Sequence, residues 1–321
     1  EININCNLNC TMCSTSLTKR PQQNMELKLF EKLVLLKKTR GLNATTLHSI
    51  GEPLMNPRLE EYLKILKKHG LKIYLLTNAQ LLHKKFDLLK KYEDIIDVFA
   101  ISIDGANKES YEKIRRPGKF DRLVKNLELL SKFNVPKRIF SIISNETKAE
   151  AAEHLKFYSQ FVRMQDISFQ LLVSLAADTS FFAKDNIFDA HTVPSYPCSS
   201  VRNSAHFQSD GTVTACGRNY TNDLVFGNIN DTKFEDLVNN ETIQTFRKYH
   251  KTNEIPKDLS CAECFSIDTR VVGLFDLFRD TLVKRHSNNW DVLKMQNKFD
   301  DFFASFREEI PNEDEYLKLI N

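Results

Sequence analysis

The stretch CNLNCTMC, Cys6–Cys13, decides how the rest of this chain is interpreted. It holds three of the chain's seven cysteines, directly after the short apolar stretch INI. The spacing is C-x3-C-x2-C, and soft thiolates favour zinc, Cu(I) or iron–sulfur clusters. A cubane [4Fe–4S] cluster usually takes four cysteines, so three local ones would leave one metal position open, as catalytic metal sites often do. A zinc site completed by a distant His or Cys is the structural alternative.

The composition is that of a globular protein with one large domain or two ordinary ones. The chain has 321 residues, a net charge of +3, 41% hydrophobic residues and 27% charged residues. A charge this close to balance does not indicate a dedicated nucleic-acid binder, and no apolar run approaches the ~20 residues of a membrane span. Clustered cysteines, odd in number, indicate metal ligands in a reducing compartment, so we expect a cytoplasmic protein. Because Glu1 rather than Met opens the chain, we expect a short segment to precede it.

Strand-like and helix-like segments alternate over the first half of the chain. Short apolar stretches predict six strands at INI (2–4), TTLHSI (45–50), KIYLLT (72–77), DVFAISI (97–103), RIFSII (138–143) and DISFQLLV (166–173). Apolar residues that recur at intervals of three and four predict helices over 25–38, 56–70, 81–92, 120–133 and 148–161. Short apolar strands with helices between them predict an α/β fold, either a parallel sheet or an incomplete barrel.

This alternation ends after Val173, and a different pattern follows. HFQS and TVTAC are predicted to be two short strands joined by Asp210-Gly211, a hairpin signal. One helix is predicted over 234–250, and further helices over 268–321. With a boundary near 175–195, we expect three parts: an α/β part over 1–180, a small α+β part over 181–267 and a helical extension over 268–321.

CNLNCTMC and three later segments together resemble the signature of radical S-adenosylmethionine (SAM) enzymes. IGEPLMNP (50–57) resembles the segment that holds the amino group of SAM, and LTNAQLL (76–82) resembles the family's TNG segment. AISIDG (100–105), with IRRPGKFD (114–121), resembles the segment after the fourth strand. Each lies at the C-terminal end of a predicted strand, where an α/β barrel places its active site. The resemblance covers most of residues 1–175 and implies a partial (β/α)6 barrel.

The resemblance also implies a chemistry and a set of site residues. In this family a [4Fe–4S] cluster chelates SAM through its open iron and, once reduced, cleaves it to a 5′-deoxyadenosyl radical that takes a hydrogen atom from an unactivated carbon. The resemblance implies that Cys6, Cys10 and Cys13 hold this catalytic cluster. It implies SAM-binding roles for eight further residues: Met12, Gly51, Glu52, Pro53, Asn78, Ser102, Asp104 and Arg115.

The polar members of this set have physical reasons to bind SAM, and structural alternatives. Glu52 would accept the ammonium group of SAM, and its alternative is a solvated loop carboxylate. Asn78, Ser102 and Asp104 would hold ribose hydroxyls or substrate, while helix N-capping is equally open for the last two. Arg115, or the arginine that follows it, would pair with a carboxylate of SAM or substrate. We expect at least one of these two arginines to be solvated.

Three positions depart from the family's pattern. Met12 stands before the third cysteine, where an aromatic residue is common, and its flexible thioether can still cover the adenine. Ile50 and Ala79 stand where the family commonly has glycine. These two loops are therefore the places where the backbone path needs to be checked.

The last four cysteines, Cys198, Cys216, Cys261 and Cys264, resemble a second family pattern. It is the C-terminal auxiliary-cluster domain called SPASM in its full form and twitch in its short form, and no cysteine follows Cys264. The resemblance implies the short form, with one auxiliary [4Fe–4S] cluster held by all four thiolates. A structural zinc held by the same four is the alternative. The spacing also resembles that of a radical SAM dehydrogenase that oxidises an aminocyclitol alcohol.

Three functions follow from these patterns. The first is a radical SAM oxidoreductase, because no cysteine is left over to return a hydrogen atom and a closed auxiliary cluster suits electron transfer. The second is a radical SAM maturase that modifies a ribosomal peptide, and the third is a zinc-stabilised binding protein without catalysis. The resemblance implies a small-molecule or peptide substrate and a reducing protein such as flavodoxin or ferredoxin. No nucleic-acid or membrane partner is expected.

Overall fold

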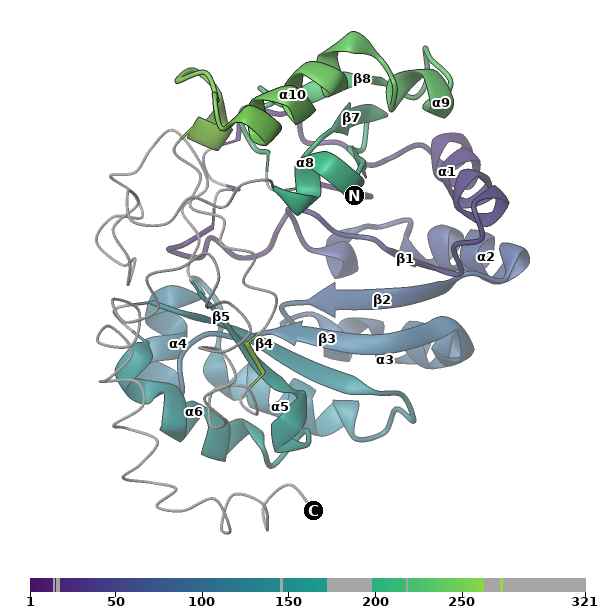
Figure 1. The fold of residues 1–321 in the computed structure, drawn as a ribbon. Helices are drawn as coiled ribbons and strands as arrows, with labels where there is room; N and C mark the ends of the chain where they lie inside the picture. The colour runs from purple at the N-terminus through teal and green to yellow at the C-terminus, as the bar shows by residue number, and fades with distance from the viewer. Residues whose placement is uncertain are drawn as a thin grey trace.

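The computed structural model describes residues 1–13, 15, 18–144, 147–171, 198–217, 219–262 and 272–273. Figure 1 shows a parallel sheet flanked by helices, with a small antiparallel sheet and its helices α8 and α10 beyond the β1 edge. The predicted boundary near 175–195 and most of the predicted C-terminal helical extension lie outside the described residues.

The larger sheet contains five parallel strands in sequence order. These are β1 (Ala44–Thr46), β2 (Lys72–Thr77), β3 (Ile96–Ser102), β4 (Lys137–Ile143) and β5 (Ile167–Leu171). A sixth, short strand, β9 (Val272–Gly273), pairs antiparallel with β5. The predicted α/β class is therefore confirmed. Residues 272–273, predicted within a helix, instead cover the β5 edge that would otherwise be unpaired.

The first predicted strand, INI, differs from the prediction. Its only strand-like feature is an isolated antiparallel bridge between Asn3 and Asn24. Ile2 donates its N–H to Leu47 O at 2.9 Å and accepts from Met25 N at 2.9 Å. Because its hydrogen bonds go to two different segments, this stretch lies beside the sheet edge without extending the parallel ladder.

Six α-helices and a 3-10 turn in the described residues cover the parallel part or support its loops, and most were predicted. They are α1 (Leu27–Thr39), α2 (Leu59–His69), α3 (Leu82–Lys91), α4 (Lys108–Ile114), α5 (Phe120–Leu130), α6 (Ala151–Tyr158) and the 3-10 turn η2 (Pro53–Met55). Further 3-10 turns are η3 (Glu93–Ile95), η4 (Lys148–Glu150), η5 (Met164–Asp166) and η6 (Ser260–Ala262). The short helix α4 was missed, although Asn107 three residues before Ser110 is a helix-start signal. Asn107 Oδ1 accepts from Ser110 N at 3.2 Å, forming a capping box.

The core of this part is built from helix faces packed on the strands. Phe30 of α1 meets Tyr62 of α2 edge to face, with ring centroids 4.8 Å apart. Phe99 of β3 is fully buried and packs on Phe133 at 4.8 Å. Burying one such side chain stabilises the fold by roughly 1.5–3 kcal/mol. These contacts hold the helices against each other and against the sheet.

The smaller part contains the predicted hairpin. Its elements are α8 (Ser199–Asn203), β6 (His206–Phe207), β7 (Thr212–Thr214), β8 (Val225–Asn228), α9 (Phe234–Leu237) and α10 (Glu241–Thr252). The Asp210-Gly211 turn joins β6 to β7 as predicted, with Gly211 at φ +89°. The single helix predicted over 234–250 is two helices, because Asn240 caps a new start by accepting from Ile243 N at 3.0 Å.

Polar contacts anchor the smaller part on the β1 side of the parallel part. Thr18 Oγ1 donates to Tyr220 O at 3.2 Å, and Ser49 Oγ donates to Gly217 O. Arg40 pairs with Glu235 at 2.6 Å. The first two contacts join the loops after Cys13 and β1 to the loop after Cys216. Among the residues described, no helix is long and apolar enough to cross a membrane.

Candidate functional site

The Cys6–Cys13 loop is fixed by backbone hydrogen bonds to the end of α4. Asn9 N donates to Arg116 O at 2.5 Å, and Thr11 N donates to Ile114 O at 2.9 Å. Within the loop, Cys13 N donates to Cys10 O at 3.0 Å. The loop is thus positioned by residues over a hundred positions further along the chain.

The three thiols of this loop lie largely away from solvent. Cys10 is buried, and Cys6 and Cys13 are half-buried. Burial raises the pKa of Cys6 to about 12 and that of Cys10 to about 11. Cys6 Sγ accepts from Leu8 N at 3.4 Å, as a thiolate would. None of the six cysteines that the structure describes forms a disulfide.

Within the described ranges, no three His, Cys, Asp or Glu side chains lie close enough to share one metal ion. A cubane cluster binds its thiolates through different irons, so its ligands stand further apart than those of a single ion. The three thiols of the Cys6–Cys13 loop are therefore too far apart to share one ion, as expected for ligands of three different irons in one cluster.

Glu52 is a buried carboxylate directly behind this loop. Its side chain Oε1 accepts from Thr77 Oγ1 at 2.7 Å and from Leu54 N at 3.1 Å, and Oε2 accepts from Asn78 N at 2.8 Å. All three donors are neutral, and a carboxylate can accept about four hydrogen bonds. Glu52 is 2% exposed, so the alternative of a solvated loop carboxylate is wrong. Burial raises its pKa, and the three hydrogen bonds oppose that rise.

The glycine before Glu52 lets two backbones approach closely. Gly51 has φ +92°, and a Cβ there would lie 2.8 Å from Asn3 O and from the backbone of Ile4. Glu52 N donates to Asn5 O at 2.8 Å. The segment before the cysteines and the Gly51-Glu52-Pro53 turn therefore pack as one unit, with Pro53 beginning η2.

Asn78 joins the carboxylate to the cysteine loop. While its N–H donates to Glu52, its side-chain amide donates to Asn7 Oδ1 at 3.0 Å and faces Cys6 Sγ at 3.8 Å. The following residue, Ala79, adopts the left-handed φ of +59°. Its N–H donates to Thr77 Oγ1 at 3.1 Å. The turn thus keeps a glycine-like path without glycine.

Ser102, Asp104 and Arg115 meet one another inside the protein. Arg115 Nε donates to Asp104 Oδ2 at 2.6 Å, and Arg115 donates to Ser102 Oγ at 2.6 Å. Asp104 Oδ1 accepts from Ile142 N at 2.6 Å. Neither Ser102 nor Asp104 caps a helix. The following arginine, Arg116, is exposed, as expected for one of the pair.

Met12 completes the set predicted around SAM. It lies half-buried in the turn between Cys10 and Cys13. The structure therefore brings Met12 and the Glu52–Asn78 pair to the cysteine loop. Arg115 is paired with the carboxylate of Asp104 from the same chain, and Asp104 has no exposed surface.

Three of the last four cysteines lie on separate segments that hydrogen bonds draw together. Ser200 Oγ, just after Cys198, donates to Ala215 O at 3.2 Å, just before Cys216. Cys261 lies in η6, buried. Cys264 lies outside the described residues.

A half-buried carboxylate that the sequence did not point out ties the second and third segments. Asp223 accepts from Ser260 N, beside Cys261, and from Thr221 Oγ1 at 2.6 Å. Asn219 also donates to it. Burial raises the pKa of Asp223, but these hydrogen bonds outweigh it and lower the pKa overall. The polar run from 219 to 223, rich in turn-forming residues, is the signal that could have found this network.

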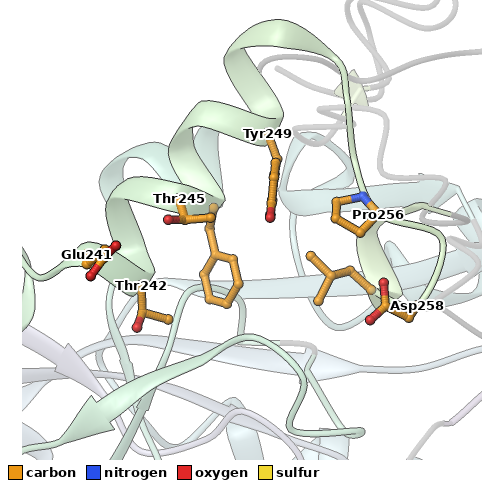
Figure 2. Close-up of a pocket in the computed structure, with 8 residues that line it drawn as sticks. Glu241, Thr242, Thr245, Tyr249, Pro256 and Asp258 are labelled. Carbon is orange, nitrogen blue, oxygen red and sulfur yellow. The ribbon is translucent and has the colours of Figure 1, made fainter.

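A groove away from these residues lies in the smaller part. It has a volume of about 380 Å³ and runs between α10 and the loop at Pro256–Leu259. Figure 2 shows Glu241 and Asp258 at its two ends, with Thr245 and Tyr249 of α10 between them. None of its lining residues belongs to the set predicted to bind SAM or metal.

Comparison with known families agrees with both sequence motifs. The model of the radical SAM superfamily matches residues 1–158, and that of SPASM, an iron-sulfur cluster-binding domain, matches residues 198–265. Both predicted resemblances are confirmed.

Curated relatives each match less than half of the chain. An AdoMet-dependent heme synthase of Methanosarcina barkeri is 30% identical over 153 residues, 47% of this chain and 43% of that protein. The antilisterial bacteriocin subtilosin biosynthesis protein AlbA of Bacillus subtilis is 28% identical over 141 residues, 43% of this chain and 31% of its own length. The chain thus spans less than half of either relative.

The fold also matches a solved structure over most of both chains. BtrN in complex with AdoMet and 2-DOIA aligns with a TM-score of 0.56 and 17% identity, over 83% of this chain and 91% of that one. At this identity the likeness shows the fold alone.

Proposed function

Because this chain belongs to the radical SAM superfamily and carries a SPASM-type domain, we propose that it is a radical SAM oxidoreductase. Its family membership brings SAM, a SAM-binding [4Fe–4S] cluster and an auxiliary iron–sulfur cluster. When bound and reduced, the first cluster cleaves SAM to a 5′-deoxyadenosyl radical that abstracts a hydrogen atom from a substrate carbon. The remaining task of the protein is to hold, orient and shield these groups.

In this proposal Cys6, Cys10 and Cys13 ligate the SAM-binding cluster. Their soft thiolates suit iron–sulfur ligation, and the loop is already fixed on both sides of Cys10. Three ligands leave one iron open for the amino and carboxylate groups of SAM. Met12, half-buried between two of these cysteines, would cover one side of the cofactor.

The observation that carries this assignment is Glu52. A buried carboxylate with three neutral donors has remaining acceptor capacity and no charge neutralisation from those donors. The ammonium group of SAM supplies a cation and hydrogen bonds to such a group. Asn78, which contacts both Glu52 and the side of Cys6, positions the carboxylate relative to the cluster.

The auxiliary cluster is proposed to bind Cys198, Cys216, Cys261 and Cys264. Its suggested role is to accept the electron left on the substrate after hydrogen abstraction, which makes the net reaction an oxidation. The Ser49–Gly217 contact supports this role, because it joins the strand-end before Gly51 to the residue after Cys216.

A peptide maturase is the second candidate. The relative named as a bacteriocin biosynthesis protein, AlbA, favours it, although the match covers only 43% of this chain. In either case a reducing protein such as flavodoxin or ferredoxin supplies electrons. The three-part division at 180 and 267, the small-molecule substrate and the cytoplasmic location are part of the same proposal.

The test begins with anaerobic purification, reconstitution, and iron and sulfide analysis. We expect about eight irons per chain, and formation of 5′-deoxyadenosine after dithionite and SAM are added. The Cys198→Ala/Cys216→Ala double variant should lose about half of the iron and keep SAM cleavage. Zinc in place of iron, with no cleavage of SAM, would refute an enzymatic function and leave the zinc-stabilised binding protein.

A further inference from the structure

Arg115 is a buried cation beside the cysteine loop. Its side chain is 7% exposed, and its guanidinium is held by Asp104 and Ser102. Arginine carries its charge at any pH at which the protein folds, so this positive charge is permanent. A buried charge of this kind needs a partner, and Asp104 supplies one.

The loop geometry places Cys10 against Arg115. Asn9 N donates to Arg116 O, and Thr11 N donates to Ile114 O. The residues on either side of Cys10 are therefore bonded to the residues on either side of Arg115. Two backbone bonds that bracket both residues fix their separation more firmly than a side-chain contact alone could.

The charged groups of this ion pair act on the Cys10 thiol. The positive charge of Arg115 lowers the pKa of Cys10, although burial raises that pKa more. Asp104 acts in the opposite sense, since its negative charge raises the same pKa. The Cys10 sulfur thus lies in the field of the Arg115–Asp104 ion pair.

We propose that Arg115 is a positioning residue that sets the reduction potential of the SAM-binding cluster through the Cys10 sulfur, with Asp104 restraining its charge and orientation. The inference rests on the proposed function, because it requires Cys10 to be a cluster ligand. Reduction adds one negative charge to the cluster, so a nearby cation stabilises the reduced form. Hydrogen bonds to cluster sulfurs and local net charge are known controls of such potentials.

This role differs from holding the carboxylate of SAM. Asp104 and Ser102 already occupy the guanidinium inside the protein. Asp104 Oδ2 lies within reach of both Nε and one terminal nitrogen, and that same terminal nitrogen donates to Ser102 Oγ. The neighbouring Arg116 is exposed and has the same charge, which makes it a matched control.

The test is a redox titration of the reconstituted full chain, followed by electron paramagnetic resonance. The signal of the SAM-binding cluster is assigned by its change when SAM is added, and its midpoint potential is then measured without SAM. We expect Arg115→Gln to shift the potential in the negative direction and Asp104→Asn to shift it in the positive direction. The double variant should lie between the two, and Arg116→Gln should match the wild type.

Opposite shifts cannot come from a loosened fold, which would change both variants in the same direction. Equal potentials in all variants, or shifts of one sign in Arg115→Gln and Asp104→Asn, would overturn the inference while leaving the proposed function in place. If Arg115→Gln fails to retain iron, Arg115→Lys keeps the charge and should have a potential close to that of the wild type, while Asp104→Asn should still shift it in the positive direction; a shift of Arg115→Lys as large as that of Asp104→Asn would overturn the inference. A wild-type chain without the SAM-sensitive signal would overturn both proposals.

Discussion

The two cysteine-bearing regions of this protein are built in different ways. Cys6, Cys10 and Cys13 share one loop, which is bonded to α4 and surrounded by buried charged groups. The later cysteines lie on separate segments after β5, beyond β7 and in η6, and these segments are joined mainly through hydroxyls, amides and one carboxylate, that of Asp223.

The polar groups of the first region leave charge and hydrogen-bonding capacity for a ligand, whereas those of the second region are used in contacts within the chain. Around the first loop, the charge of Glu52 is not matched by its three neutral donors. Around the second, Asp223 accepts from Asn219, Thr221 and the Ser260 backbone and holds chain segments together. The first region is suited to bind a cationic ligand, and the second to cross-link its own chain.

Removing one ligand from each region gives the largest expected contrast. Cys10→Ala should abolish formation of 5′-deoxyadenosine, because the open-iron cluster then lacks a third protein ligand. Cys261→Ala should keep SAM cleavage, while the auxiliary iron, about half of the total, is lost. Iron analysis and a SAM-cleavage assay on both variants measure this contrast.

The contrast between the two cysteine-bearing regions is contradicted if Cys261→Ala stops SAM cleavage while the chain retains its SAM-binding cluster. That result would mean that the auxiliary site takes part in the first step and not only after it. Circular dichroism of each variant serves as the folding control.

Glu52 tests the binding capacity of the first region. Glu52→Gln keeps the shape of the side chain but removes its charge, so the attraction to the SAM ammonium falls. A charge-assisted hydrogen bond contributes about 1.5–3 kcal/mol, which corresponds to a SAM dissociation constant raised by roughly ten- to a hundredfold. Anaerobic equilibrium dialysis with labelled SAM measures it.

Glu60→Gln, on the surface of α2, is the control for Glu52→Gln and should bind SAM as the wild type does. Iron content should be unchanged in both variants. If SAM affinity is also unchanged in Glu52→Gln, then Glu52 is a structural carboxylate that holds the turn at Thr77 and Asn78, and our assignment of the ammonium site is wrong.

Local signals made the positions of the loops predictable. CNLNCTMC and Gly51-Glu52-Pro53 can be recognised because each function needs particular residue types at fixed short spacings. The strands and most helices followed from apolar periodicity in the same way. The path of Ala79 was less certain from sequence, since its positive φ depends on Thr77 Oγ1 and on Asn126, which donates to Ala79 O at 2.6 Å.

Contacts between distant positions could not be predicted in this way. The pairing of Arg115 with Asp104, and of Asp223 with Ser260, appears only once the strand ends and turns have folded together. From the sequence, Arg115 and Asp104 were each predicted to bind SAM or substrate, and Asp223 was not singled out. The short INI stretch was overpredicted for a related reason, because its apolar residues fill the core without joining a ladder.

Asp223 tests how far the second region depends on its internal hydrogen bonds. Asp223→Ala leaves three donors without their acceptor, so we expect a loss of about 2–3 kcal/mol in the free energy of unfolding. Auxiliary iron should fall, and the SAM-sensitive cluster should be retained. Denaturant unfolding and iron analysis measure the two effects. Asp231→Ala, at an exposed turn, should change neither, and an equal effect there would show that the Asp223 network is unimportant.

The smallest expected effect concerns the response of the two regions to acid. Burial lowers the pKa of His154, in α6, to about 3 and that of His206, in β6, to about 4. A histidine whose folded pKa lies below the unfolded value of about 6.5 stabilises the fold while neutral, so its contribution is present above pH 6.5 and is lost as the pH falls toward the folded pKa.

His154, which has the lower folded pKa, continues this loss to a lower pH than His206 does. Its ring lies 2.6 Å from Ser141 Oγ and 3.2 Å from Gly105 O, contacts that suit a neutral ring with its proton on Nδ1. Below pH 6.5 the wild type should lose about 1.4 kcal/mol of unfolding free energy per pH unit from this one group. His154→Gln should be less stable at pH 8, and its slope below pH 6.5 should be shallower than that of the wild type by this amount, because His206 still contributes its own share. His83→Gln, at an exposed position of α3, should keep the full wild-type slope. Denaturant unfolding between pH 8 and pH 5.5 measures these slopes, and an unchanged slope in His154→Gln would show that the buried ring of His154 does not contribute to the acid sensitivity.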